Sequence, residues 1–239
     1  MMVTQEDFKN HQRERKKSSS NIFSEIILGG QDGLVNTLGV VLGIIAATSD
    51  IKILLAGAIA AAFAESISMA AVAYTSKKAE YENYISETNK EEKEIEEIPE
   101  MEKEEIRNIF KKWEVDDNDT ETLVEIISKN KKAWVEIMLA HELELGKISN
   151  EKPLKFSITV GLSALIGSFI PIFPIILIPT KHIWIGPIIA SALALLIIGY
   201  IKTKLTIGNP LKGGLQLMTI GIMSAIAGYL IGYFVGGNR

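Results

Sequence analysis

Two acidic residues lie inside long apolar stretches, where a charged side chain is costly. Asp32 and Glu65 each stand among residues hydrophobic enough to cross a membrane. An ionised carboxylate in hydrocarbon costs at least about 2.5–3.5 kcal/mol, so such acids usually face a bundle interior or a water-filled path. A buried acid that only holds helices together is the simpler alternative. The two acids therefore predict either a structural hydrogen bond or a path for a cation.

The neighbours of both acids add further ligand types at helical spacing. Asn36 follows Asp32 at i+4 and Met69 follows Glu65 at i+4, so each pair shares one helix face. From their depths in an antiparallel hairpin, we expect Asp32 opposite Met69 and Asn36 opposite Glu65. Oxygen ligands with a thioether suit a borderline transition metal better than Mg²⁺ or Ca²⁺. We expect a metal path here, although a lone methionine is otherwise a packing residue.

A second set of candidate ligands lies in an acidic segment, residues 76–152. Three pairs have the spacing that puts two side chains on one helix face: Glu91 with Glu94, Glu102 with Glu105, and Met138 with Glu142. Carboxylates that converge from several helices form the cages of helical di-iron proteins. A solvated charged helix is the alternative, because glutamate is abundant in this segment. His141 lies one residue off the face of the third pair.

Five apolar stretches are long enough to carry these residues across a membrane, which takes about 20 residues per helix. We predict spans at 26–48, 53–75, 155–178, 183–201 and 214–236. Prolines should kink the third span or end it early: Pro171, Pro174 and Pro179. In the first span two glycine pairs, each four residues apart, predict close helix packing: Gly29 with Gly33, and Gly39 with Gly43.

The acidic segment is expected to form three helices or slightly more. We predict them at roughly 77–97, 100–113 and 131–146, with a short one at 119–129, and Pro99 separates the first two. The predicted fold is an all-α membrane protein with five transmembrane helices and a cytoplasmic metal-binding insert between the second and third. The predicted domains are a basic segment 1–25, a hairpin 26–75, the acidic domain 76–152 and the remaining spans 153–239.

Charge is divided unevenly along the 239-residue chain. Residues 76–152 carry 22 acidic and 13 basic side chains, a net charge of −9, and the rest of the chain carries +5. This division excludes an ordinary soluble enzyme with a mixed surface. The acidic block would be repelled by the phosphates of nucleic acid. The chain has no cysteine, so disulfides and thiolate metal sites are excluded.

Basic residues predict the orientation in the membrane. Lysines and arginines precede the first span and also separate the fourth from the fifth: Arg13, Arg15, Lys16 and Lys17, then Lys202, Lys204 and Lys212. Such residues favour the cytoplasm. The N-terminus and the acidic insert are therefore expected inside and the C-terminus outside. Since no signal peptide or vacuolar targeting signal is readable, we expect a multi-pass protein of the cell membrane.

Two motifs stand out in the first two spans. They read Gly30-Gln31-Asp32-Gly33-Leu34-Val35-Asn36-Thr37-Leu38-Gly39 and Ala64-Glu65-Ser66-Ile67-Ser68-Met69-Ala70. Together with the Glu-rich insert and Trp134 to Leu145, they resemble the vacuolar iron transporter family. The resemblance covers nearly the whole chain, most specifically residues 27–145. It implies a homodimer that exports Fe²⁺ from the cytosol, coupled to proton movement in the opposite direction.

The resemblance also implies roles for individual residues. Asp32 and Met69 would be ligands in the membrane path, and the ligands of the insert would be Glu91, Glu94, Glu102, Glu105 and Glu142, with Met138. This sequence departs from the family at two positions. Leu139 stands where a second methionine is often found, and Ala61 where a glutamate is often found. Glu65 lies one turn nearer Met69 on the same face and is expected to take over that charge.

Our sequence-based interpretation is a proton-coupled metal exporter and not an enzyme. Fe²⁺ is the first expected substrate and Mn²⁺ the second, and Zn²⁺ or Co²⁺ are further ions that the same residues could bind. No organic cofactor is expected. The expected partners are a second copy of the chain, the lipid bilayer, metal ions and protons. Two alternatives are a membrane-anchored di-iron oxidase and a metal store or sensor. Di-iron bundles usually supply Glu-x-x-His pairs, which the insert lacks, and neither alternative explains Asp32 and Glu65.

Overall fold

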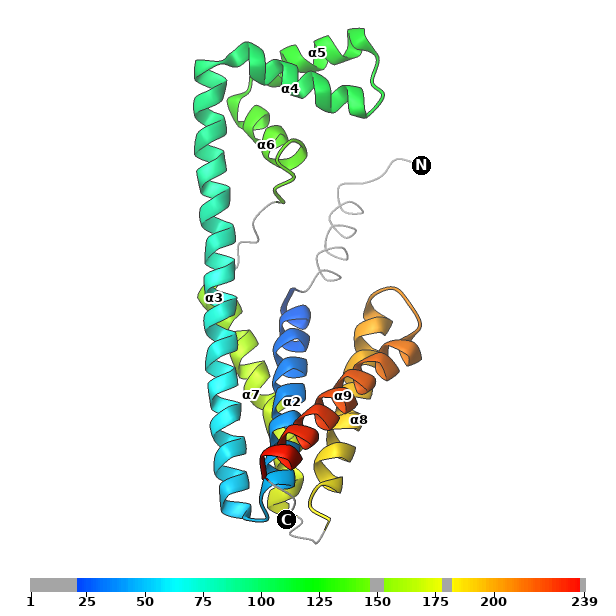
Figure 1. Ribbon diagram of the computed structural model, residues 1–239. Helices are drawn as coiled ribbons and strands as arrows, with labels where there is room; N and C mark the ends of the chain where they lie inside the picture. The colour runs from blue at the N-terminus through cyan, green and yellow to red at the C-terminus, as the bar shows by residue number, and fades with distance from the viewer. Residues whose placement is uncertain (1–20, 147–152, 178–181, 237–239) are drawn as a thin grey trace, which may run out of the picture. The chain divides into compact units, whose positions relative to one another are not determined.

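The computed structural model describes residues 21–146, 153–177 and 182–236. This part of the chain forms eight α-helices and no strand, which confirms the all-helical prediction for the described residues (Figure 1). Its contacts divide the chain into two compact units. We call Met1–Tyr74 with Pro153–Arg239 the membrane unit, and Thr75–Lys152 the insert. The basic residues predicted to precede the first span lie outside the described residues.

Five helices are long and apolar enough to cross a membrane, as predicted. Four lie in the membrane unit and a fifth begins there: α2 (Asn21–Ala47), α7 (Pro153–Leu177), α8 (Ile185–Leu205), α9 (Pro210–Gly236) and α3 (Ile51–Glu97). A tight turn joins α2 to α3. In it Asp50 Oδ1 accepts a hydrogen bond from the backbone N–H of Lys52 at 2.7 Å, which caps the start of α3. The protein is therefore a multi-pass membrane protein.

The third span continues through two prolines and does not end early. Helix α7 runs to Leu177 with Pro171 and Pro174 inside it. Proline removes a backbone donor, but membrane bundles tolerate this because neighbouring helices and side chains compensate. Pro171 is fully buried, and the adjacent Ile172 belongs to the apolar core between α2, α3 and α7. Pro179 lies outside the described residues.

Glycines let α2 approach two neighbouring helices closely. A Cβ atom added at Gly29 or Gly33 would collide with backbone carbonyl oxygens of α7. Gly39 and Gly43 face α9, and the opposing residues there are also glycines: Gly228 and Gly232. The close helix packing predicted from the two glycine pairs is therefore confirmed, with one pair used for each neighbour.

The insert contains the second half of α3 and three shorter helices. These are α4 (Pro99–Lys112), α5 (Asp117–Ser128) and α6 (Lys131–His141). Pro99 begins α4, a position that tolerates its missing N–H. Side chains cap the other two: Asp116 accepts from the N–H of Asn118 at 2.9 Å, and Asn130 from that of Ala133 at 3.2 Å. The predicted helical segments are thus all present.

The last helix of the insert is shorter than predicted. Helix α6 ends at His141 and not near residue 146. The backbone turns there, because the N–H groups of Leu143 and Leu145 bond back to the carbonyls of Met138 and Leu139 at 3.1 and 2.8 Å. Glu144 adopts a left-handed conformation with φ 52°. Such bonds satisfy the last carbonyls of a helix and stop it.

Candidate functional site

Three of the four predicted path residues interact directly in the membrane unit. Asn36 Nδ2 donates to Asp32 Oδ2 at 3.3 Å on one face of α2. The side chains of Asp32 and Glu65 are joined by a hydrogen bond between α2 and α3. Two carboxyl groups share a hydrogen bond only when one of them carries a proton. We call Asp32, Asn36 and Glu65 the membrane cluster.

The pairing of residues between α2 and α3 differs from the prediction by about one turn. Depth alone placed Met69 opposite Asp32, whereas the structure brings Glu65 to Asp32. The reason lies in the turn, since α2 ends at Ala47 and α3 begins at Ile51. The hairpin is therefore centred on Ser49, slightly earlier than predicted. Counting outward from that centre puts Glu65 within one residue of the level of Asp32.

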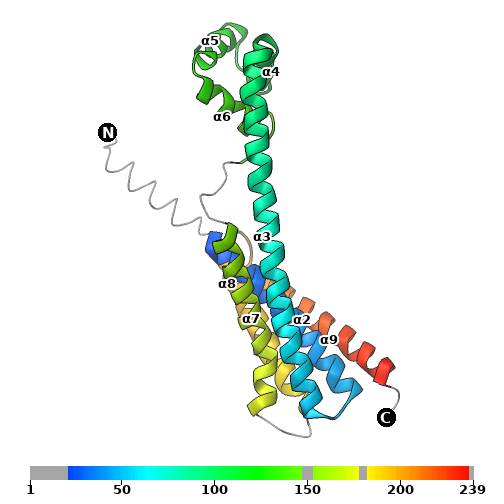
Figure 2. The same ribbon diagram turned by 90° about the vertical axis from the view of Figure 1, so that its left-hand side faces the viewer.

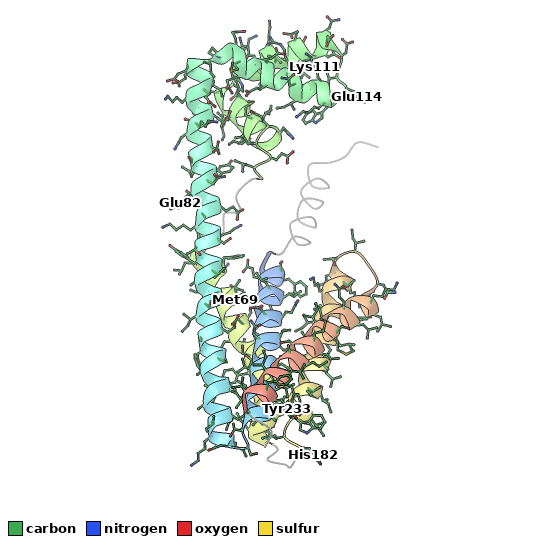
Figure 3. The ribbon with its side chains drawn as sticks, viewed as in Figure 1. Met69, Glu82, Lys111, Glu114, His182 and Tyr233 are labelled. Atoms are coloured by element: carbon green, nitrogen blue, oxygen red, sulfur yellow. The ribbon has the colours of Figure 1, made fainter. Side chains whose placement is uncertain are left out.

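Met69 lies beside the membrane cluster. It stands on the half of α3 that belongs to the membrane unit, four residues after Glu65, and is partly buried (Figure 3). On the observed register it is level with Gly29, about one helical turn from Asp32. Ala61, where the resemblance suggested a glutamate, is also partly buried one turn before Glu65. The acidic side chain at this part of α3 is therefore Glu65 alone.

A hydrogen bond between α3 and α7 fixes the position of Glu65. The hydroxyl of Ser66 donates to the carbonyl oxygen of Gly161 at 2.7 Å. A Cβ atom at Gly161 would lie only 2.8 Å from Cβ of Ala70, so the glycine permits this close approach. Helices α3 and α7 run side by side at this point (Figure 2). Ser66 is thus a positioning residue that the sequence analysis did not single out.

A third acid in the membrane unit was also missed. Glu25, in the first turns of α2, is only 3% exposed. It precedes Asp32 by seven residues, which brings two side chains to nearly the same helix face. The i,i+7 spacing from Asp32 indicates this position, although Glu25 lies just before the predicted first span.

The membrane cluster opens onto an uncovered face of α2 and α3. Asn36 is exposed, while Asp32 and Glu65 are only partly buried. Next to Glu65, α3 carries small exposed residues at every fourth position: Ala56, Ala60, Ala64 and Ser68. Polar groups at membrane depth face protein or water and not lipid. This face must therefore be covered by something other than hydrocarbon.

The insert brings its predicted glutamates together from three helical segments. Glu91 and Glu94 lie at the end of α3, Glu102 and Glu105 in the first turns of α4, and Glu142 directly after α6. Glu91 and Glu102 are each only 2% exposed. One oxygen of each, Oε2, is buried and makes no hydrogen bond to the described residues. We call these five residues the glutamate cluster.

Mutual repulsion shows how close these carboxyl groups are. Burial, with the nearby charges of Glu105 and Glu91, raises the pKa of Glu102 to about 7. Burial and the charge of Glu105 likewise raise the pKa of Glu142 to about 7, and a side-chain hydrogen bond joins these two groups. Carboxyl groups that perturb each other in this way are neighbours in the fold. Near neutral pH the glutamate cluster therefore holds protons that a cation can displace.

The predicted sulfur ligand is buried in the apolar core of the insert. Met138 is 0% exposed and packs in the same cluster as Ile106, Phe110 and Trp134. Leu139, which replaces a second methionine, is 2% exposed in the same core. The side chain of His141 does not join the glutamates and stacks edge-to-face against Trp113, with ring centroids 4.8 Å apart. Packing is thus a sufficient role for Leu139 and His141.

The side chains are not arranged as a finished metal centre. Among the described residues, no three acidic or histidine side chains lie where they could hold one ion together. Glu94 and Glu105 are half-buried and Glu142 is exposed, so these three have room to change rotamer. The buried pair, Glu91 and Glu102, is fixed by packing. The geometry is that of a cluster in which two fixed acids face three movable ones.

Comparison with known proteins covers the part of the chain that carries both groups of residues. The model of the VIT family matches residues 23–233, which include the membrane cluster and the whole insert. The chain belongs to the VIT family. Its sequence is 29% identical to vacuolar iron transporter 1 of Arabidopsis thaliana over 223 residues, 93% of this chain and 89% of that one. It is also 29% identical to the vacuolar iron transporter of Plasmodium falciparum over 224 residues, 89% of this chain and 82% of that one.

Membership of the VIT family thus rests on nearly the full length of the chain. A third relative, vacuolar iron transporter 1 of Tulipa gesneriana, is 29% identical over 225 residues, which cover 94% of this chain and 91% of the tulip protein. At this identity the fold is shared, while individual side chains must be argued from their own surroundings.

Proposed function

We propose that this VIT-family protein exports Fe²⁺ from the cytosol in exchange for protons, with Mn²⁺ as a second substrate. The observation that carries the proposal is the contact between Asp32 and Glu65. It places two acids from different helices in one cluster of the membrane unit. The relatives' names, vacuolar iron transporter, support iron as the substrate.

The membrane cluster has the chemistry for exchange. A divalent cation that binds Asp32 and Glu65 replaces the proton shared between them, and the amide oxygen of Asn36 can add a neutral ligand. When the metal leaves, a proton restores the hydrogen bond between the two carboxyl groups. Metal outward and proton inward thus use the same oxygens in alternation. Met69, one turn away, supplies a thioether, which suits Fe²⁺ better than the hard cations Mg²⁺ and Ca²⁺.

The insert is proposed to collect metal before transport. Its net charge of −9 attracts cations, and the glutamate cluster offers several carboxylates within reach of one another. Fe²⁺ would bind with release of protons from Glu102 and Glu142. Met138 would contribute its sulfur only if α6 shifts, since that side chain is buried. In this proposal the insert is a reservoir of metal for the path.

We propose a homodimer in which the second copy covers the open face beside the membrane cluster. Asn36 is exposed on that face, and no helix of the described residues covers the stripe of small residues on α3. Small residues at every fourth position let two membrane helices approach closely. A dimer packed there would enclose the path between the two subunits and remove Asn36 from lipid.

The proposed orientation follows the lysines of the membrane unit. Lys202, Lys204 and Lys212 lie at the ends of α8 and α9 that meet each other, and positive residues favour the cytoplasm. The insert would then be cytoplasmic and the C-terminus outside. The sequence predicts the cell membrane, whereas the relatives' names refer to a vacuolar membrane. In both membranes this orientation would carry metal out of the cytosol.

Flux measurements on the purified protein in sealed vesicles test this function. Wild-type protein should move Fe²⁺ across the membrane and move protons the opposite way, recorded by a metal-sensitive and a pH-sensitive dye together. Oxygen consumption is measured in the same vesicles. Iron-dependent oxygen uptake without flux would make the protein an oxidase, and saturable binding without either would make it a store or sensor.

A further inference from the structure

A small apolar crevice lies on the outside of the membrane unit between α2, α7 and α8. Its volume is about 220 Å³, and its walls are almost wholly hydrocarbon, chiefly Phe23, Ile26, Ile166, Ile170, Ile198 and Ile201. Ile166 is 69% exposed and Ile201 is 41% exposed, so the crevice faces the lipid. It is separate from the membrane cluster and has no part in the proposed transport.

Two glycines account for the crevice. A Cβ atom at Gly167 of α7 would collide with the backbone carbonyl of Gly30 on α2, so the two backbones touch there. Both glycines line the crevice, and neither has a side chain to fill the space outside that contact. The neighbouring isoleucines stand on either side of it. A narrow slot of this kind, open to the membrane, suits a hydrocarbon chain better than a protein side chain.

A cation stands at one end of the slot. Lys202 follows Ile198 by four residues on α8, so it lies on the same helix face one turn nearer the end of the helix. Lys155 lies on nearly the same face of α7 as Ile166 but eleven residues before it, about 16 Å along the helix axis, so it adds positive charge at this end of the membrane unit without lining the slot. No acidic residue occurs from Pro153 to the C-terminus, so none on α7, α8 or α9 competes for Lys202. On α2, Glu25 stands next to the lining residue Ile26 and is buried, at 3% exposed.

We propose that this crevice is a specific site for one anionic phospholipid in the membrane leaflet at the lysine-rich end. One acyl chain occupies the slot between the isoleucines, and the ammonium group of Lys202, one turn beyond Ile198, binds the phosphate. The headgroup is expected to be anionic because Lys202 is positively charged, and the slot is expected to bind an acyl chain because its walls are hydrocarbon. A lipid held there braces α2 against α7 and α8, the helices that carry or support Asp32.

Native mass spectrometry of the full-length protein tests the proposal. The probes are dioleoyl phosphatidylglycerol and dioleoyl phosphatidylcholine, supplied together in equal amounts before delipidation. The wild type should retain phosphatidylglycerol preferentially, and Lys202→Gln should lower that preference by about fivefold, the effect of one lysine near an anionic headgroup. Lys204→Gln is the matched control, because it removes the same charge two residues further on, from the opposite face of α8. It should retain the wild-type preference.

Two results would overturn the site. Equal losses in Lys202→Gln and Lys204→Gln would mean diffuse attraction to the helix end, and no headgroup preference in the wild type would mean ordinary hydrocarbon contact. A third possibility, that a second copy of the chain fills the slot, is tested by Ile166→Cys. The wild-type chain has no cysteine, so efficient disulfide-linked dimers of this variant in membranes would make the crevice a subunit interface.

Discussion

Asp32 on α2 is hydrogen-bonded to Glu65 on α3, although 33 positions separate them in the sequence. The same carboxyl group of Asp32 accepts from the amide of Asn36 at 3.3 Å. In the proposed mechanism this carboxyl pair alternates between two states, one bridged by a proton and one bridged by a cation. The proposed exchange mechanism depends on both states being available to the same atoms.

Glu65 should be required for transport even though the resemblance pointed to a different position on α3. Glu65→Gln keeps the size of the side chain and can still hydrogen-bond Asp32, but it removes the second negative charge. We expect Fe²⁺ flux to fall at least about tenfold, equivalent to about 1.4 kcal/mol. Vesicle uptake measures this. Unchanged flux in this variant would limit the path to Asp32 and its neighbours on α2.

Glu102 should be required for metal binding by the insert. Glu102→Gln removes the buried, fixed carboxylate of the glutamate cluster, and Fe²⁺ or Mn²⁺ binding to the full-length protein should weaken by at least about tenfold in calorimetry. Glu125→Gln is the matched control, since Glu125 is an exposed glutamate on α5. If both variants bind like the wild type, the glutamates of α4 form an ordinary charged surface.

Metal binding by the insert should depend on pH around neutrality. The pKa values of Glu102 and Glu142 are both raised to about 7, so protons compete with the metal below that pH. The affinity for Mn²⁺ should rise between about pH 6 and about pH 8, with release of close to two protons per ion at the lower end. Calorimetry in buffers of different ionisation enthalpy counts those protons, and an affinity independent of pH would contradict the raised pKa values.

The same shifts give the metal-free insert an unusual stability profile. A glutamate with a raised pKa in the folded state holds its proton where the unfolded chain has lost it. The folded state then binds more protons than the unfolded state, so the free energy of unfolding falls as pH rises from about 4.5 to about 7. Thermal unfolding of the metal-free protein should therefore occur at lower temperature at the upper end of this window, and added Mn²⁺ should restore it.

Gly29 should not tolerate any side chain, whereas Gly30 should tolerate a small one. A Cβ atom at Gly29 would collide with the carbonyl oxygen of Val160, but at Gly30 the nearest atom, the carbonyl oxygen of Ser163, is 3.6 Å away. Gly29→Ala should destabilise the protein by about 1–3 kcal/mol, as overpacked cores do. Gly30→Ala should leave the unfolding temperature nearly unchanged. Equal melting temperatures for the two variants would contradict the close contact between α2 and α7.

Much of this architecture could be predicted from the sequence because hydrophobic length and proline position are local signals. These two signals were sufficient to predict the five spans and the break at Pro99. The register of α2 against α3 could not be predicted to better than a turn, since it depends on where the connecting turn is centred. The end of α6 was missed for a related reason, because backbone bonds to Met138 and Leu139 stop the helix without a glycine or proline to signal it.

The candidate site divides in the same way. Spacing on single helices brought out Asp32, Asn36 and the glutamate pairs. The structure places Asp32 beside Asn36 in the membrane unit and, separately, the glutamate pairs near each other in the insert. Interactions between helices left weaker marks in the sequence. Ser66 bonds to α7, but a serine in a membrane helix is not unusual, and Glu25, buried at the start of α2, is indicated only by its i,i+7 spacing from Asp32. Such roles follow from the packing of helices far apart in the chain.

The most direct test of the central claim is Fe²⁺ flux through Asp32→Asn in sealed vesicles under a proton gradient. Asn keeps the shape of the side chain and removes the group that binds metal and proton in turn. Asp50→Asn is the matched control, because it removes an acid from the α2–α3 turn while asparagine still caps α3. We predict that Asp32→Asn folds, binds metal at its insert and transports none, while Asp50→Asn transports like the wild type. Wild-type flux through Asp32→Asn would contradict the account.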